Sequence, residues 1–151
     1  MGLDMYLILG RTSSENITNV KDVEDLKSLF NKIVVTVKED FTIGYWRKAN
    51  AIFTLIENTC KPEGIEDCEH IYISVDQVKT MLDICKQVKE NPDTAHEKLP
   101  TQSGFFFGST EYDEYYFETI DYTIELFEKV LTFMSKNDND NYYDIIFYAW
   151  W

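Results

Sequence analysis

The chain has few basic residues for its length. Its 151 residues contain 14 lysines and arginines against 27 aspartates and glutamates, a formal net charge of −13. Nucleic-acid phosphates are bound through clustered lysine and arginine side chains, so this deficit argues against direct binding of DNA or RNA. The acidic surplus favours a partner protein with a basic surface or a cation, although it is equally typical of proteins that charge keeps in solution.

Cysteine and histidine are scarce as well. Three cysteines, an odd number without regular spacing, indicate reduced thiols in a cytosol rather than a disulfide framework. Zinc ligands usually come in closely spaced pairs, whereas seven residues separate Cys60 from Cys68. His70 and His96 are the only histidines, and no nucleophile elbow, phosphate-binding loop or HExxH motif accompanies them. We therefore expect no metal, no cofactor and no enzymatic activity.

Long apolar runs are missing too. No segment approaches the 18 consecutive apolar residues that indicate a transmembrane helix. The first residues lack the basic region of a secretory signal, and Asp4 lies among them. The sequence predicts a cytoplasmic protein that does not contact a membrane.

What is present predicts a single α+β domain over residues 1–151, because 44% hydrophobic residues at this length can bury a proper core. Alternating or β-branched segments predict a small, mainly antiparallel sheet. The expected strands are 3–9, 33–43 (with a turn near 39–40), 71–73 and 143–150. Polar loops are expected at 10–20 and 61–69, and a long loop at 92–109.

Three or four helices are expected to pack against this sheet. The patterns predict them at 21–31, at 46–59, from Ser74 to Asn91, and between Thr110 and Asn137. Ser74, followed three residues later by Gln77, has the pattern of a capping box. The last helix crosses the sheet, with a predicted inner stripe of Phe117, Ile120, Ile124, Phe127, Leu131 and Met134.

A row of carboxylates follows this last helix at a spacing of three and four residues. Its members are Glu114, Glu118, Asp121, Glu125 and Glu128. The spacing puts them on one side of the helix, about 100° from the predicted inner stripe. Such a row could dock on the basic groove of a nucleic-acid-binding protein, and the alternative is a solvated helix face.

The segment 100–110 is a second candidate site. Gly104 and Gly108 bracket three consecutive phenylalanines, and five neutral polar residues surround them. Such a loop could accept a base, a ribose hydroxyl or a peptide edge, or it could be a structural loop whose phenylalanines fill the core. The adjoining basic pair Arg47 and Lys48 could complete a small-molecule site, with Arg47 pairing to Asp113 or Glu114.

The ligand-binding candidates of that hypothesis come from two segments, 46–50 and 101–113. They are Trp46, Arg47, Lys48, Asn50, Thr101, Gln102, Gly104, Phe106, Gly108, Ser109, Tyr112 and Asp113. The expected ligand is nucleotide-like.

Four sequence blocks resemble a family of small uncharacterised proteins of tailed bacteriophages and prophages. They are MGLDMYL at 1–7, GYWRKANAI at 44–52, LPTQSGFFFGSTEYDEYY at 99–116 and YDIIFYAW at 143–150. The chain departs from the family at Phe53, where histidine is common. The resemblance implies a phage accessory protein in the cytoplasm of a bacterial host, but it implies no activity.

Two functions are therefore expected in order. The first is inhibition of a host defence or nucleic-acid-handling protein through the acidic helix face, by analogy with anti-CRISPR proteins and DNA mimics. The second is binding or sequestration of a nucleotide-like molecule. A homodimer through the Trp150-Trp151 end is a further possibility, the alternative being that this end folds inward.

Overall fold

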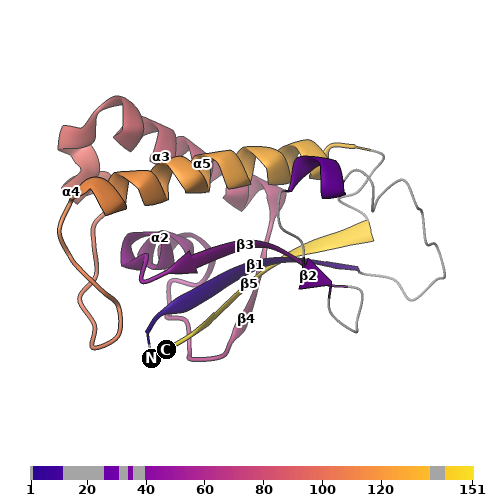
Figure 1. The fold of residues 1–151 in the computed structure, drawn as a ribbon, viewed down its shortest axis with the longest axis horizontal. Helices are drawn as coiled ribbons and strands as arrows, with labels where there is room; N and C mark the ends of the chain where they lie inside the picture. Colours follow the sequence, from indigo (N-terminus) through magenta and orange to yellow (C-terminus); the bar gives the residue numbers. More distant parts are fainter. Residues whose placement is uncertain (1, 12–25, 31–33, 36–39, 137–141) are drawn as a thin grey trace.

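The computed structural model describes residues 2–11, 26–30, 34–35, 40–136 and 142–151. Its centre is a five-stranded antiparallel sheet with the strand order β2-β3-β1-β5-β4. The strands are β1 (Asp4–Arg11), β2 (Val34–Val35), β3 (Phe41–Arg47), β4 (His70–Ile73) and β5 (Tyr143–Trp150). The C-terminal strand lies between β1 and β4, so the first and last strands form the middle of the sheet (Figure 1).

The long helices cover one face of this sheet (Figure 1). They are α2 (Asn50–Cys60), α3 (Val75–Glu90) and α5 (Glu114–Met134), joined by η1 (Pro92–Thr94) and α4 (Ala95–Lys98). Residues 26–29 are also helical. The α+β class, the antiparallel sheet and the long last helix followed by a final strand are thus confirmed.

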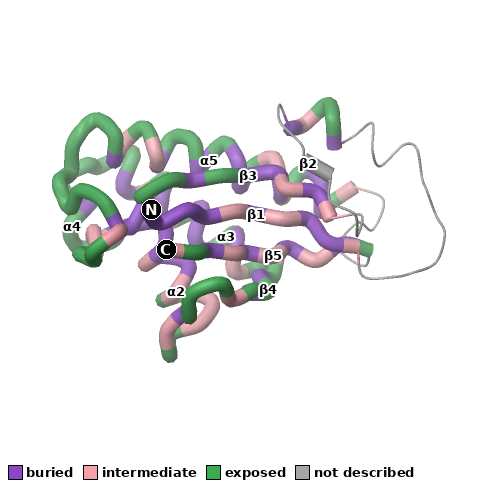
Figure 2. Tube along the Cα trace, turned by 60° about the horizontal axis from the view of Figure 1, so that its bottom comes forward, coloured by how far each residue is buried: buried purple, intermediate pink, exposed green. Residues whose placement is uncertain are grey.

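The two central strands explain why the helices lie on one side. Met5, Leu7 and Leu9 are fully buried, and their antiparallel partners in β5 are buried as well. Tyr6 and Tyr148, which alternate with them, are only half-buried and face away from the helices. Figure 2 shows this alternation along the strands. A period of two places one residue set in the core and the other on the outer face.

The predicted start of the second helix is wrong. Trp46 and Arg47 belong to β3, where they pair with Met5 and Asp4, and α2 begins only at Asn50. Trp46 is buried, and its Nε1 donates a hydrogen bond to Thr123 Oγ1 at 3.0 Å. Cross-strand pairing and burial of the indole therefore outweigh the helical pattern.

The long loop predicted at 92–109 is partly wrong. Pro92 opens a 3-10 turn that continues into α4, so the irregular segment begins only at Leu99. The predicted N-cap Thr110 is wrong as well, because Asp113 caps α5 by accepting a hydrogen bond from Tyr116 N at 3.0 Å. The capping box of Ser74 and Gln77 is confirmed at the start of α3.

The inner face of α5 is rotated from the predicted stripe. Phe117 and Leu131 are only half-buried, whereas Leu126, Val130 and Phe133 are buried. The helix contacts both β3 and α3, so its buried arc is wider than a single stripe. The carboxylate row consequently lies opposite the core, not about 100° from it.

Several predictions concern residues outside the described ranges. The polar loop at 10–20 lies there from residue 12 onward, and β1 extends through Gly10 and Arg11. Only 26–30 of the predicted helix at 21–31 is described, and Leu26 and Phe30 are buried in it. The strand predicted at 33–43 is seen as β2 and the start of β3.

No helix in the described ranges has the length and apolar character that crossing a membrane requires.

Candidate functional site

Residues 99–113 form a loop at one end of the molecule, between α4 and α5 (Figure 1). We call it the Phe105 loop. Two hydrogen bonds close its neck: Thr101 Oγ1 donates to the carbonyl of Thr110 at 2.9 Å, and the Tyr116 hydroxyl donates to the carbonyl of Leu99 at 2.7 Å. Burial raises the pKa of Tyr116, so this hydroxyl stays protonated and remains a donor.

Asn50, at the start of α2, holds the interior of the Phe105 loop. Its side chain is 3% exposed. The amide nitrogen donates to the carbonyls of Phe107 at 3.0 Å and Ser109 at 2.8 Å, and Oδ1 accepts from Gln102 N at 2.9 Å. One buried side chain thus satisfies three backbone groups that would otherwise lack partners.

Phe107 anchors the loop in the core. Its ring packs edge-on against Phe53 at 5.3 Å and against Trp151 at 5.6 Å. Gly108 has φ +87°, and a Cβ there would lie 2.7 Å from Lys48 Cβ. This close approach with positive φ requires glycine. The position usually occupied by histidine in the similar phage proteins, Phe53, is therefore part of the anchor.

Phe105 is the opposite case. It is 95% exposed, and its nearest ring contact is Phe106, whose centroid lies 4.7 Å away. The carbonyl of Phe106 accepts a hydrogen bond from Leu3 N at 2.9 Å, which fixes the backbone beside the exposed ring. The loop therefore holds an aromatic side chain in solvent on a well-anchored backbone.

The structure brings most of the predicted ligand-binding residues together, but the fold already uses their polar groups. Gln102 Oε1 accepts from Thr54 Oγ1 at 2.7 Å, and Tyr112 donates to Thr101 N or accepts from it at 3.2 Å, the geometry favouring acceptance. The Ser109 hydroxyl accepts from Glu111 N at 3.1 Å. Trp46 lies in the core, away from any loop surface.

The space between these residues is small. A hollow of about 30 Å³ lies between the start of α2, the Phe105 loop and the first turns of α5. Lys48, Asn50, Thr101, Ser109 and Asp113 contribute to its lining. One water needs roughly 10–15 Å³ of such volume. The hollow therefore has room for one or two waters and not for a nucleotide.

The predicted pairing of Arg47 with Asp113 or Glu114 is not formed by these described residues. Arg47 lies on the outer side of β3, and it is its backbone carbonyl that accepts a hydrogen bond, from the Tyr115 hydroxyl. Asp113 instead caps α5. The two segments are joined through tyrosine and backbone rather than through an ion pair.

The carboxylate row on α5 divides into two parts. Asp121 pairs with Lys89 of α3 at 2.6 Å and Glu128 with Lys86 at 2.8 Å, while Glu125 pairs with Lys129 one turn on at 2.7 Å. Glu114 and Glu118 are exposed and form no ion pair within the described ranges. The unbalanced negative charge of the row is thus concentrated at the start of α5, next to the Phe105 loop.

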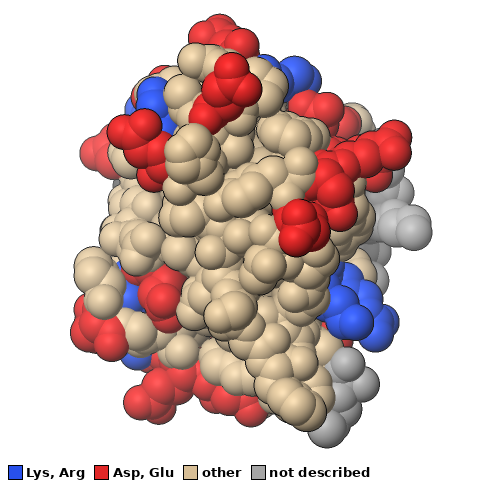
Figure 3. Space-filling model, turned by 90° about the vertical axis from the view of Figure 1, so that its left-hand side faces the viewer, with Lys and Arg blue, Asp and Glu red and all other residues tan. Residues whose placement is uncertain are grey.

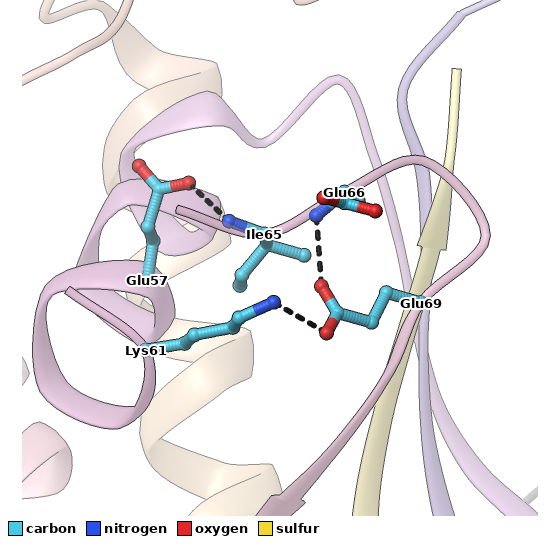
Figure 4. Close-up of polar contacts among 5 residues, drawn as sticks. All are labelled: Glu57, Lys61, Ile65, Glu66 and Glu69. Carbon is cyan, nitrogen blue, oxygen red and sulfur yellow. Dashed lines mark hydrogen bonds and ion pairs between the residues drawn. The ribbon is translucent and has the colours of Figure 1, made fainter. Parts of the chain in front are cut away.

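Other carboxylates of this acidic chain have structural roles. In the 61–69 loop, Glu57 accepts from Ile65 N at 2.9 Å, and Glu69 accepts from Glu66 N at 2.9 Å and pairs with Lys61 (Figure 4). Asp67 accepts a hydrogen bond from Trp151 N at 2.9 Å. The Trp151 ring packs on Phe53, so this end of the chain folds inward, whereas Trp150 stays partly exposed.

Figure 3 views the end of the molecule that carries α4, the Phe105 loop and the start of α5. A continuous band of uncharged atoms crosses this end, and aspartate and glutamate side chains border it on several sides. An apolar band with an acidic border complements a partner surface that is apolar in the middle and basic at its rim.

The three cysteines differ sharply in reactivity, which gives a first prediction. Burial raises the pKa of Cys60 to about 11 and that of Cys85 to about 12, while Cys68 is exposed. Because only the thiolate reacts, we expect one fast thiol with Ellman's reagent at pH 8 and two that react only after unfolding. Cys68→Ser should remove the fast phase, and a second fast thiol would contradict the assignment.

Among the described residues, no three histidine, cysteine or carboxylate side chains come together as metal ligands.

Sequence reasoning missed two features of this region. It did not distinguish Phe105 from its neighbours, because a run of three phenylalanines carries no periodicity. It also missed Tyr115 and Tyr122, seven residues apart on α5. The Tyr115 hydroxyl caps Arg47 O, and the Tyr122 hydroxyl accepts from Tyr45 N at 3.1 Å, both along the edge of β3. Their spacing of two helical turns was the available signal.

Comparison with protein-family models, with curated proteins and with solved structures finds no match in any of the three. The argument for function therefore depends on the geometry of the site.

Proposed function

We propose that this chain is a binding protein that docks on a partner protein through the Phe105 loop and the start of α5. One observation carries the proposal: Phe105 is 95% exposed on a loop whose backbone is fixed by buried hydrogen bonds. Leaving a phenylalanine side chain in water forgoes about 1.5–3 kcal/mol of burial. A rigidly presented aromatic ring is typical of the anchor residues that dominate protein interfaces.

The charge around this ring supports a partner with a basic rim. Glu111, Glu114 and Glu118 are exposed beside the loop, and Glu114 and Glu118 belong to the row predicted from the sequence. Rim charges chiefly accelerate association and select among partners. The proposal extends to inhibition of a host defence or nucleic-acid-handling protein in a bacterial cytoplasm, and that extension rests on the resemblance to phage proteins.

Binding of a nucleotide-like molecule by the 46–50 and 101–113 segments has weaker support. The hollow between them has room for about one or two waters, and Asn50 and Gln102 are already hydrogen-bonded within the fold. We therefore favour a protein partner for this end of the molecule.

Charge reversal tests the proposed surface. We expect the double variant Glu114→Lys/Glu118→Lys to weaken partner binding by about tenfold, mainly through slower association. The partner would be captured from bacterial lysate on the wild-type protein, identified by mass spectrometry and measured by surface plasmon resonance. Binding of the wild type should also weaken between low and high salt, because exposed charges are screened.

The matched control is Asp121→Lys/Glu128→Lys, which changes the net charge equally but lies on the side of α5 that faces α3. We expect this control to bind within about twofold of wild type. Equal loss in both variants would mean that total charge, not this surface, determines binding. Full binding by Glu114→Lys/Glu118→Lys would exclude the start of α5 from the interface.

A further inference from the structure

The largest cavity recorded for the described part of the chain lies away from the Phe105 loop. It has a volume of about 590 Å³ and opens between β3, α5 and Phe30. The same layers are seen from the side in Figure 1, where α5 runs above β3. Pockets that bind small molecules have about 300–1,000 Å³. This cavity therefore has room for a small molecule, which the hollow of about 30 Å³ at the predicted ligand site does not.

The fold keeps this space open by holding α5 at a distance from the strand. The hydroxyls of Tyr115 and Tyr122 reach the backbone of β3, so a full tyrosine side chain separates helix and strand edge. Gly44 lies between them without a side chain, and a Cβ there would lie 2.4 Å from Leu126 Cδ2. Capping by the two tyrosines also satisfies edge groups of β3 that could otherwise pair with another strand.

The walls of the cavity are apolar and aromatic. Phe30, Ile43 and Leu126 supply apolar surface, and Tyr6, Tyr45 and Tyr122 supply three phenol rings. The Tyr6 and Tyr45 rings lie 5.2 Å apart and tilted, and the Tyr45 hydroxyl donates to Asp4. Aromatic rings in such arrangements pack well against another flat ring.

The polar groups of the cavity are few and complementary. Lys129 and Glu125 form an ion pair at 2.7 Å, so a strong donor and a strong acceptor lie side by side on its lining. Tyr122 accepts from Tyr45 N, which leaves its hydroxyl proton free to donate. A neighbouring donor and acceptor suit a heterocycle with an adjacent carbonyl and N–H group. The ion pair carries no net charge, and the chain as a whole is at −13, so a phosphate is disfavoured.

We propose that the cavity between β3 and α5 binds a small, uncharged, planar heteroaromatic molecule of the nucleobase or nucleoside class. The ring lies against the tyrosines and Leu126, and its polar edge meets Lys129 and Glu125. The site is independent of the protein-binding surface proposed above, because it involves neither the Phe105 loop nor Glu114 and Glu118.

Isothermal titration calorimetry of the full chain with adenosine, guanosine, cytidine and uridine tests the proposal. We expect at least one nucleoside to bind with a Kd of about 0.1 mM or tighter, and its 5′-monophosphate to bind more weakly. Lys129→Met keeps the aliphatic stem but removes the charged donor, and should weaken binding about tenfold. The matched control Lys86→Met breaks the ion pair with Glu128 outside the cavity and should leave the Kd within about twofold.

Nuclear magnetic resonance locates the ligand in the unmutated protein, so the test does not depend on the stability of a variant. We expect nucleoside addition to shift the backbone amides of Gly44 and Tyr45 and not those of Gly104 and Gly108. No binding of any nucleoside at about 1 mM, equal affinity of Lys129→Met and wild type, or tighter binding of the monophosphate would each overturn the proposal.

Discussion

Replacing Phe105 by alanine is expected to weaken partner binding by about 30-fold or more without a change in stability. A central aromatic anchor typically contributes 2 kcal/mol or more on truncation to alanine. Because Phe105 is 95% exposed in the free protein, the change removes almost no buried surface, and the free energy of unfolding should stay within about 0.5 kcal/mol of wild type. Surface plasmon resonance and thermal denaturation measure the two quantities.

Tyr72→Ala is the matched control for this prediction. Tyr72 is another strongly exposed aromatic residue, on β4 and outside the Phe105 loop. If loss of any exposed ring reduced adhesion to the partner, the two variants would behave alike. A Phe105→Ala variant that binds as well as wild type would mean that the exposed ring is not the anchor of the interface.

Replacing Asn50 by alanine is expected to destabilise the protein by about 3 kcal/mol. The change leaves two carbonyls and one N–H of the Phe105 loop without their buried partner, at roughly 1 kcal/mol or more each. For a chain of this length the melting temperature should fall by about 6–12 °C. Partner binding should weaken as well, because Phe105 is then no longer held in one position.

Two variants sharpen this test. Asn50→Asp has the same shape, but it places carboxylate oxygens where the amide donates to Phe107 and Ser109, so it should destabilise at least as much as alanine. Asn58→Ala, at an exposed position of the same helix, should be nearly neutral. An Asn50→Asp variant as stable as wild type would show that the two donated hydrogen bonds do not hold the loop, since an acid at a helix start is otherwise favourable.

Comparison of particular elements shows where sequence reasoning failed. The alternation in β1 and β5 and the capping box at Ser74 identified their elements correctly, because these patterns depend on neighbours in the chain. The assignment of Trp46 to a helix failed because its environment is made by Met5 and Thr123, which are distant in sequence. The buried arc of α5 failed for the same reason, since β3 and α3 determine it together.

The candidate site shows the same division. The sequence placed Asn50, Gln102 and Ser109 in one region, and they do lie together, but as a hydrogen-bonded support for the loop rather than as a ligand site. It indicated the carboxylate row on α5, but the lysines that neutralise Asp121 and Glu128 come from α3. Charge pairing between helices could not be inferred from the spacing within one of them.

The sequence by itself determined the α+β class, the acidic surface and most of the regular elements, because hydrophobic period and capping are local properties of the chain. Only the tertiary structure decided which of three consecutive phenylalanines faces water, which carboxylates remain unpaired, and where space for a small molecule is left. These features depend on groups brought together from different elements. Their energies exist only once the sheet and α5 have packed, so no local pattern encodes them.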